Sequence, residues 1–261
     1  MTLKIYQIDT FTNKLFQGNP AAVCPLENWL DDNTLQNIAT ENNLSETAFF
    51  VKEGQDYKIR WFTPTSEVDL CGHATLAASF VLFNHLNYSA ESINFKSKSG
   101  VLTVRKSNNH YVLDFPTDKL KKVNLTEELL KPFTTKPIEA FKGNSDYLLV
   151  FETESSIKSM SPNISDLAKI KARGIIVTAK GSETDFVSRF FGPLVGVDED
   201  PVTGSAHTSL IPYWFERLQK TELTAKQLSS RGGNLKCKYK GNRVEISGNA
   251  VTYLVGNINL G

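Results

Sequence analysis

The sequence predicts an α+β protein of two pseudo-symmetric halves, each a mixed, curved β-sheet wrapped around a central helix. Three observations support this fold class. A nine-residue motif recurs in the second half, an almost uninterrupted apolar segment predicts a buried helix, and alternating segments predict strands around it. A chain of 261 residues, 40% of them hydrophobic, is long enough for two such halves.

The recurring motif reads DYKIRWFTP at residues 56–64 and DFVSRFFGP at residues 185–193, an offset of 129 residues. Matched segments in a fixed order, at slowly growing offsets, are expected for a duplicated unit with a few loop insertions. We therefore divide the chain into an N-terminal repeat half, 1–118, and a C-terminal repeat half, 119–261. Three further pairs match at offsets of 129, 132 and 133: residues 34–39 with 163–168, 72–75 with 204–207, and 101–104 with 234–237.

The elements of the first half follow from periodicity. Residues 4–10 alternate and are rich in β-formers, which predicts a strand, and residues 31–41 begin with acidic residues, as a helix does. Residues 48–51 and 57–62 predict two more strands. Residues 75–83 are apolar on every side of a helix, and such a helix must be enclosed by protein.

The second half predicts the same order of elements. Residues 206–218 predict the second central helix, with a kink or an early break at Pro212. Strand hairpins are expected at residues 100–115 and 234–246. The polar segment 115–136 is the expected linker between the halves.

Both halves place a glycine at the expected start of the central helix: Gly72 in the first, and Gly204 followed by Ser205 in the second. The first N–H groups of a helix have no partner within it, so helix starts bind anions, and glycine lets a ligand approach the backbone. Ordinary capping is the alternative for either motif alone. The pair predicts a cleft between the halves that binds a small anionic, carboxylate-bearing substrate.

Candidate acid–base groups accompany these motifs. Glu46 follows Ser45 and precedes an apolar strand, where a raised carboxyl pKa would suit a general acid or base; an exposed glutamate is the alternative. His73 could be a second acid or base. Asp200 could hold a substrate amine or hydroxyl, or cap the second helix. Asn19, held extended by the proline after it, could aim its amide at the cleft or merely form a turn.

Cys71 requires separate consideration, because a thiol at a helix start has a depressed pKa and can act as a nucleophile or base. Its counterpart in the repeat is Thr203, so a mechanism with one thiol on each face of a carbon is not expected. We interpret Cys71 as a small packed residue.

The composition bounds the partners and the compartment. Twenty-nine basic and 28 acidic residues give a net charge of +1, which does not favour a nucleic-acid partner. No stretch approaches the roughly 18 apolar residues of a membrane span, and no leader-like segment opens the sequence. The three cysteines lack metal-ligand spacing. We expect a cytoplasmic protein with free thiols, no metal and no other cofactor.

Four motifs resemble the PhzF family of phenazine-biosynthesis proteins, and the resemblance spans nearly the whole chain. They are FQGNPAAV at residues 16–23, SETAFF at 45–50, RWFTP followed by DLCGHATLAA within 60–78, and SRFFGP followed by DEDPVTGSAH within 188–207.

The resemblance implies the diaminopimelate epimerase-like fold, a homodimer, and a site between the two halves. It also implies that Glu46 shuttles a proton, that His73, Asp200 and Ser205 surround the substrate, and that Gly72 and Gly204 supply backbone donors. Pro201 stands where epimerase relatives have a second cysteine, which argues against epimerisation by two thiols.

We therefore hypothesise a cofactor-independent isomerase that transfers a proton on a small, amino-acid-like or cyclic carboxylate, with Glu46 as general acid and base. Two alternatives stay open. One is an epimerase or racemase that depends on Cys71, and the other is a small-molecule-binding protein that has lost turnover.

Overall fold

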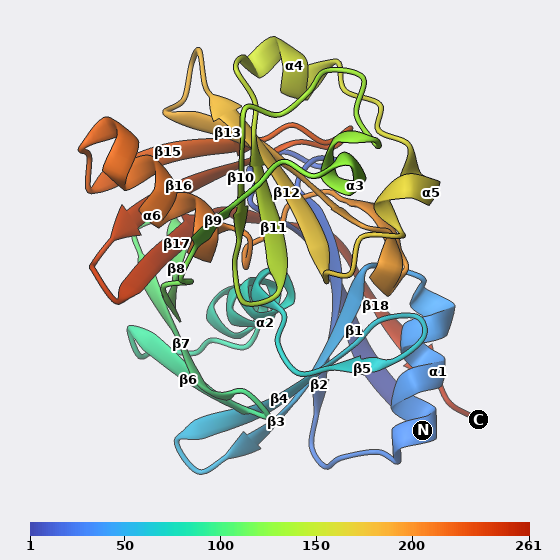
Figure 1. The fold of residues 1–261 in the computed structure, drawn as a ribbon. Coiled ribbons are helices and arrows are strands. Elements are labelled where there is room, and N and C mark those ends of the chain that lie inside the picture. Colours follow the sequence, from blue (N-terminus) through green and yellow to red (C-terminus); the bar gives the residue numbers. More distant parts are fainter. The chain divides into compact units, whose positions relative to one another are not determined.

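The computed structural model describes all 261 residues, which form two compact units (Figure 1). Unit 1 comprises Met1–Asp114 and Ser247–Gly261, and unit 2 comprises Phe115–Ile246. The sequence-based division assigned the C-terminal segment to the second half. It belongs to unit 1 because β18 (Ala250–Asn259) pairs antiparallel with β1 (Thr2–Thr10).

Unit 1 has a mixed sheet. The pairs β1–β2, β3–β4, β4–β5, β6–β7 and β7–β8 are antiparallel, whereas β2–β3 and β4–β6 are parallel. Besides β1 and β18, the elements are β2 (Asn19–Leu26), α1 (Asp32–Asn42), β3 (Glu46–Glu53), β4 (Asp56–Phe62), β5 (Glu67–Val68), α2 (Gly72–His85), β6 (Ser92–Ser97), β7 (Gly100–Ser107) and β8 (His110–Pro116), which crosses the unit boundary.

Unit 2 has a mixed sheet too. The pairs β9–β10, β10–β11, β12–β13, β13–β14 and β15–β16 are antiparallel, and β11–β12 and β13–β15 are parallel. Its elements are β9 (Lys121–Val123), α3 (Glu127–Leu130), β10 (Glu139–Lys142), β11 (Asp146–Val150), α4 (Glu154–Lys158), α5 (Ile164–Leu167), β12 (Gly174–Lys180), β13 (Phe186–Gly192), the 3₁₀ turn η1 (Pro193–Val195), β14 (Val197–Asp200), α6 (His207–Leu218), β15 (Glu222–Gln227), β16 (Gly233–Tyr239) and β17 (Arg243–Gly248).

The two units repeat one order of strand pairing, as the sequence predicts. The series antiparallel, parallel, antiparallel, antiparallel, parallel, antiparallel runs through β1–β7 in unit 1 and through β10–β16 in unit 2. The strand registers give the same correspondence residue by residue. Trp61 pairs with Ala48 in unit 1, and its counterpart Phe190 pairs with Ile176 in unit 2.

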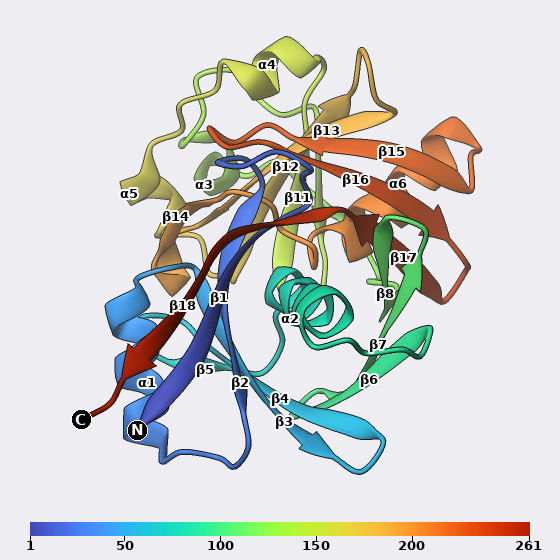
Figure 2. The ribbon, with the colours of Figure 1, turned by 180° about the vertical axis from the view of Figure 1, so that it is seen from behind.

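The central helix of unit 1 confirms the prediction of an enclosed helix. Its ten buried residues include the small Ala74, Ala77 and Ala78, which let neighbouring strands approach closely. Its larger Leu76 and Val81 fill the space between the strands. α2 contacts β1, β2, β3 and β7, and Figure 2 shows it among these strands. Full burial of each large aliphatic side chain contributes about 1.5–3 kcal/mol.

Of the kink or early break predicted at Pro212, the break is wrong, since α6 runs without interruption from His207 to Leu218. A proline cannot donate to the carbonyl four residues before it, here that of Thr208. That carbonyl instead accepts from the backbone N–H of Asp118 at 3.1 Å, and the Asp118 carboxylate accepts from the Ser209 hydroxyl at 2.8 Å. The residues before β9 thereby satisfy the group that the proline leaves free.

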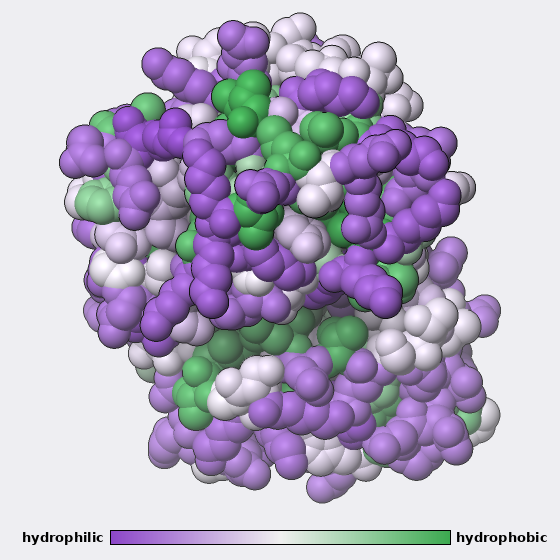
Figure 3. Space-filling model, in the orientation of Figure 1, coloured by the Kyte–Doolittle hydropathy of each residue, from purple (hydrophilic) through white to green (hydrophobic).

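Hydrophilic residues cover much of the molecular face in Figure 3, with hydrophobic residues exposed in smaller areas. The helices of the structure are all too short or too polar to cross a bilayer. The three cysteines are free and buried.

Candidate active site

The candidate acid–base carboxylate lies at the start of a buried strand. Glu46 is the first residue of β3, and the next four residues of that strand are buried. The strand is held on both sides, because Glu46 pairs with Ala21 of β2 and the following residues pair with β4. The Glu46 side chain is 19% exposed, so a small substrate can reach a carboxylate that is otherwise surrounded by protein.

His73 lies beside this carboxylate. It is the second residue of α2, and its Nε2 atom lies 3.3 Å from Oε2 of Glu46. Burial lowers the pKa of His73 to about 3, so the imidazole is neutral at physiological pH and carries one ring proton. The two atoms are close neighbours, but no hydrogen bond joins Nε2 to Oε2 in this arrangement.

Cys71 completes a cluster of three reactive side chains. The thiol Sγ lies 3.4 Å from Nδ1 of His73, on the opposite edge of the ring from the nitrogen that faces Glu46. Cys71 precedes the first residue of α2, and its side chain makes no capping hydrogen bond. The sequence favoured a packed residue at this position and left a reactive thiol as the alternative, and the structure gives the thiol a defined polar neighbour.

The same three side chains have the composition of a metal site, which their sequence spacing did not indicate. One ligand-type atom from each of Glu46, Cys71 and His73 lies within 4.8 Å of the other two. The ring presents a different nitrogen to each neighbour, however, and a histidine ligand binds one ion through one nitrogen. The geometry therefore does not favour a single coordination centre.

The two remaining candidates of unit 1 flank these groups. Asn19 is completely buried and opens β2, two residues before the partner of Glu46, so the two positions share one face of the sheet. Its backbone carbonyl accepts from the hydroxyl of Thr10 at 2.9 Å. The sequence suggested an extended residue or a turn, and the structure begins a strand there. Ser45 is half-buried directly before β3.

The candidates of unit 2 share the loop between β14 and α6. Asp200 ends β14, and its carboxylate accepts from the hydroxyl of Thr203 at 2.5 Å. Gly204 and Ser205 form a turn, since the Gly204 carbonyl accepts from the N–H of His207 at 3.0 Å. The second helix therefore begins three residues after its glycine, whereas α2 begins at Gly72 itself.

Two residues that the sequence analysis missed hold this loop. Gln227 is completely buried and bonds to both sides of the turn: its Oε1 accepts from the N–H of Thr203 at 2.9 Å, and its Nε2 donates to the Asp200 carbonyl at 2.8 Å. A polar residue at an inward position of the alternating strand β15 was the available signal. Arg173 donates to the Ser205 hydroxyl oxygen at 3.0 Å and forms an ion pair with Asp146.

The repeat does not duplicate the candidate base. In the strand registers, Gly174 of β12 occupies the position of Glu46 in β3, because Gly174 pairs with β11 as Glu46 pairs with β2. A Cβ atom at Gly174 would lie 2.0 Å from the ring of Phe190, so a side chain there would require that ring to move. The molecule therefore carries this carboxylate position once.

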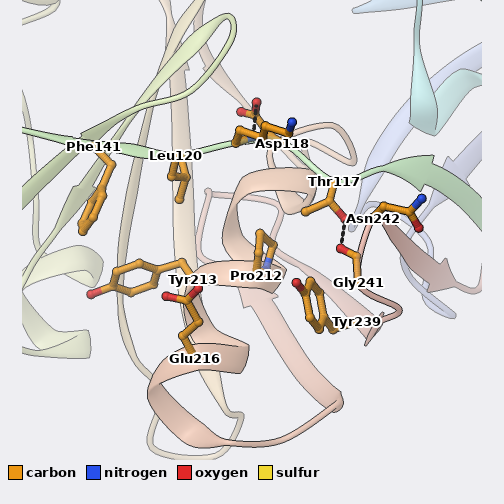
Figure 4. A pocket seen from close by; sticks show the side chains of 11 residues that line it. Thr117, Asp118, Leu120, Phe141, Pro212, Tyr213, Glu216, Tyr239, Gly241 and Asn242 are labelled. Atoms are coloured by element: carbon orange, nitrogen blue, oxygen red, sulfur yellow. Dashed lines mark hydrogen bonds between the residues drawn. The ribbon is translucent and has the colours of Figure 1, made fainter.

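The structure thus brings Glu46, His73 and Cys71 together in unit 1, and Asp200, Gly204 and Ser205 together in unit 2. The expected cleft shared by both halves stays a prediction. A separate hollow of about 560 Å³ in unit 2 lies between residues of α6, β10 and β16, with Phe141, Tyr213 and Tyr239 among its walls (Figure 4). None of the predicted site residues lines it.

Comparisons with known proteins agree with the motifs. The model of the PhzC-PhzF family, described as phenazine biosynthesis-like protein, matches residues 8–256. The chain is 50% identical over 260 residues to an uncharacterized isomerase of Pseudomonas aeruginosa, covering 100% of both chains. It is 41% identical to a phenazine biosynthesis-like domain-containing protein of Bos taurus, covering 99% of both.

Solved structures give the same result. A PhzF-family phenazine biosynthesis protein of Enterococcus faecalis is 48% identical and superposes with a TM-score of 0.97 over 100% of both chains. A hydroxyproline epimerase from Agrobacterium vitis has only 7% identity but a TM-score of 0.67, covering 99% of this chain and 93% of that one. The latter likeness concerns the fold alone, and it confirms the epimerase-like fold class.

Proposed function

This chain is an isomerase of the PhzC-PhzF family of phenazine biosynthesis-like proteins, and we propose that it transfers a proton on a small carboxylate-bearing substrate with Glu46 as the acid–base group. The observation that carries the proposal is that the carboxylate of Glu46, whose side chain is 19% exposed, lies 3.3 Å from a neutral, buried His73. Such a pair is equipped to accept and return one proton.

A single base suits an isomerisation better than an inversion by two groups. Glu46 takes a proton from a carbon next to an electron-withdrawing group and returns it to another carbon of the same molecule. The site needs no second base for this, and the counterpart of Glu46 in the repeat is Gly174. The protons balance, since the carboxyl group that forms in the first step is consumed in the second.

The anion that develops on the substrate requires stabilisation, because carbon acids are weak. The start of α2 supports this role, since Gly72 is its first residue and no side chain caps that end. Backbone N–H groups of the first helical turn, together with the helix dipole, favour a carboxylate or an enolate oxygen. Asp200 and Ser205 are proposed to bind the substrate, with Arg173 and Gln227 fixing their loop.

The test is deuterium uptake from solvent. Wild-type protein in D₂O is incubated with a bacterial metabolite extract, and mass spectrometry identifies small carboxylic acids that gain one mass unit through a new C–D bond. Glu46→Gln keeps the shape of the side chain but removes its basicity, so uptake should fall by at least about a hundredfold.

The matched control is Glu53→Gln at the other end of the same strand, where the carboxylate is bound by Lys96. This variant should label the same metabolites at the wild-type rate. Equal labelling by wild type and Glu46→Gln would remove Glu46 from its role. Protein that is stabilised against heat by a metabolite it never labels would favour the alternative of a binding protein without turnover.

The expected cytoplasmic location, the absence of a cofactor and the homodimer stay predictions. Light scattering of the full chain measures its oligomeric state directly and tests the homodimer.

A further inference from the structure

We propose that a second copy of this chain binds to an exposed apolar patch on unit 1. Two segments that are far apart in the sequence form the patch: Leu15 and Phe16 from the connection between β1 and β2, and Tyr253, Leu254 and Val255 from β18. None of the candidate site residues belongs to it, and the proposal does not depend on the proposed reaction. It gives the expected homodimer a defined surface.

The strand β18 exposes three consecutive large apolar side chains. Tyr253, Leu254 and Val255 are 47%, 41% and 46% exposed. Successive residues of a strand point to opposite faces of its sheet, so the exposure of both Leu254 and Val255 means that neither side of β18 is covered at this point. β18 pairs with β1, and Figure 2 shows the two strands side by side. The exposed side chains are therefore accessible to another molecule.

A β-bulge lies within this segment. The register of β18 against β1 shifts between Gln7 and Ile8, which leaves Tyr253 opposite no residue of β1. A bulge bends and twists a strand and disfavours pairing with an added strand. We therefore expect the second copy to contact the side chains of the patch rather than to extend the sheet.

Phe16 is held at the surface in an unusual conformation. Its φ of 68° is rare for a bulky residue, and its backbone N–H donates to the buried carboxylate of Asp9 at 2.9 Å, which fixes the turn. The ring is 68% exposed and meets that of Tyr253 edge to face, with 5.9 Å between the ring centroids. Strained residues of this kind occur preferentially at functional sites. The fold therefore presents this ring to solvent and joins the two segments into one patch.

The patch is large for the surface of a monomer. Of the twelve large hydrophobic residues that the chain exposes, five gather here. Their exposed fractions correspond to roughly 500 Å² of surface, whereas the largest apolar patch of a typical monomer measures about 300–600 Å² and is often functional. A stable dimer buries about 800 Å² on each partner, so the patch can form the apolar centre of an interface whose polar rim supplies the rest.

The absence of charge in the patch favours a second copy of this chain as the partner. None of the five residues is charged, and β18 contains no Asp, Glu, Lys or Arg. Across a two-fold axis the same patch of both copies meets, so a charge close to the axis would face its own like charge. A different partner is typically recognised through opposite charges, and this patch provides none. Aromatic side chains and few charges are also typical of the core of homodimer interfaces.

Light scattering of the full-length protein after gel filtration tests the association. The wild type should have twice the 29.1 kDa mass of the chain at micromolar concentration. Leu254→Glu brings two like charges into the desolvated contact, so the dissociation constant should rise at least about a hundredfold and the mass should fall to that of one chain. A wild-type protein with the mass of a monomer would overturn the proposal and leave the patch to a partner of another kind.

Two further variants separate loss of the contact from loss of the fold. Phe16→Asn removes the apolar ring but suits the left-handed conformation, in which asparagine is common, so the monomer should remain folded while dimerisation weakens at least about tenfold. Val101→Glu is the matched control, since Val101 is a 62% exposed residue of β7 outside the patch, and this variant should dimerise like wild type. A dimer that survives both Leu254→Glu and Phe16→Asn, or one that Val101→Glu disrupts equally, would contradict the proposed surface.

A thiol cross-link locates the contact directly. The three native cysteines are buried, so a cysteine introduced at position 254 is the accessible thiol of each copy. A flexible bismaleimide that can span the patch should link two copies of Leu254→Cys and should not link Val101→Cys. The linked product should be lost when Phe16→Asn is combined with Leu254→Cys. Equal linking of the two cysteine variants at the same concentration would indicate random collision and count against the placement.

Discussion

Gly18 shows how one residue without a side chain positions a candidate site residue. It lies directly before Asn19 with φ of 69°, a conformation that favours glycine. A Cβ atom at this position would lie 2.0 Å from the carbonyl oxygen of Thr10 and 2.7 Å from a methyl group of Thr12. The connection between β1 and β2 can therefore approach its own backbone only with glycine there.

We expect Gly18→Ala to destabilise the protein by about 2–4 kcal/mol, of which about 1 kcal/mol comes from the positive φ and the rest from the clash. Gly54→Ala is the control, because Gly54 has a similar φ of 65° but nothing within 4 Å of an added Cβ. Urea unfolding of both variants gives the comparison. Equal losses of stability in the two variants would show that the close approach to Thr10 does not add to the cost of Gly18→Ala.

At the residue scale, the sequence motifs predicted Glu46 and His73 as site residues, because a carboxylate before an apolar strand and a histidine at a helix start are visible as local patterns; the structure places the two side chains 3.3 Å apart. They did not identify the contact of Cys71 with the ring, since that depends on side-chain directions at the first turn of α2. Arg173 and Gln227 were missed because their roles depend on partners 24 to 32 residues away.

At the element scale, the repeat preserves an arginine that connects two strands. Arg60 of β4 forms a bidentate ion pair with Glu67 of β5 at 2.8 and 2.9 Å. Its counterpart Arg189 of β13 does the same with Glu199 of β14 at 2.7 and 2.9 Å. The arginine of the nine-residue motif therefore has a structural role, because it fixes each short strand that leads toward a central helix.

Arg60→Lys should lower the free energy of unfolding by about 1 kcal/mol, since an ammonium group cannot reproduce the two parallel hydrogen bonds of a guanidinium. Arg189→Lys should destabilise the protein more, because Arg189 also donates to the carbonyls of Ile157 and Met160. The further partner of Arg60 is the exposed carboxylate of Asp32, which contributes less. Thermal unfolding of the two variants, beside the more exposed Arg217→Lys, measures the difference. A smaller loss for Arg189→Lys than for Arg60→Lys would contradict this account of the motif.

At the scale of the whole molecule, each unit contains one buried, neutral histidine. Burial lowers the pKa of His73 to about 3 and that of His207 to about 4, against about 6.5 for an unfolded chain. Below pH 6.5 the unfolded chain binds protons that the folded protein does not. The free energy of unfolding must therefore fall as the pH drops from about 7 toward 4.

The free energy of unfolding should change by up to about 1.4 kcal/mol per pH unit for each histidine, and this dependence on pH should vanish above pH 7. The ionised form of Glu67, whose pKa Arg60 lowers to about 2, loses its contribution only below about pH 4.5. Urea unfolding between pH 8 and 4.5 tests this, with His207→Gln expected to lower the slope by about half. An unchanged slope in that variant would show that His207 does not contribute.

The sequence by itself determined the fold class, the duplication, the enclosed helix and the family motifs, because each of these is written in local periodicity or in the order of short segments. Only the tertiary structure decided that the C-terminal strand joins unit 1, that α6 continues through Pro212, and that Cys71 and Glu46 face opposite edges of one imidazole. These features depend on which backbone groups and side chains distant segments present to one another. Hydrogen-bond partners of that kind leave no periodic signal in the chain.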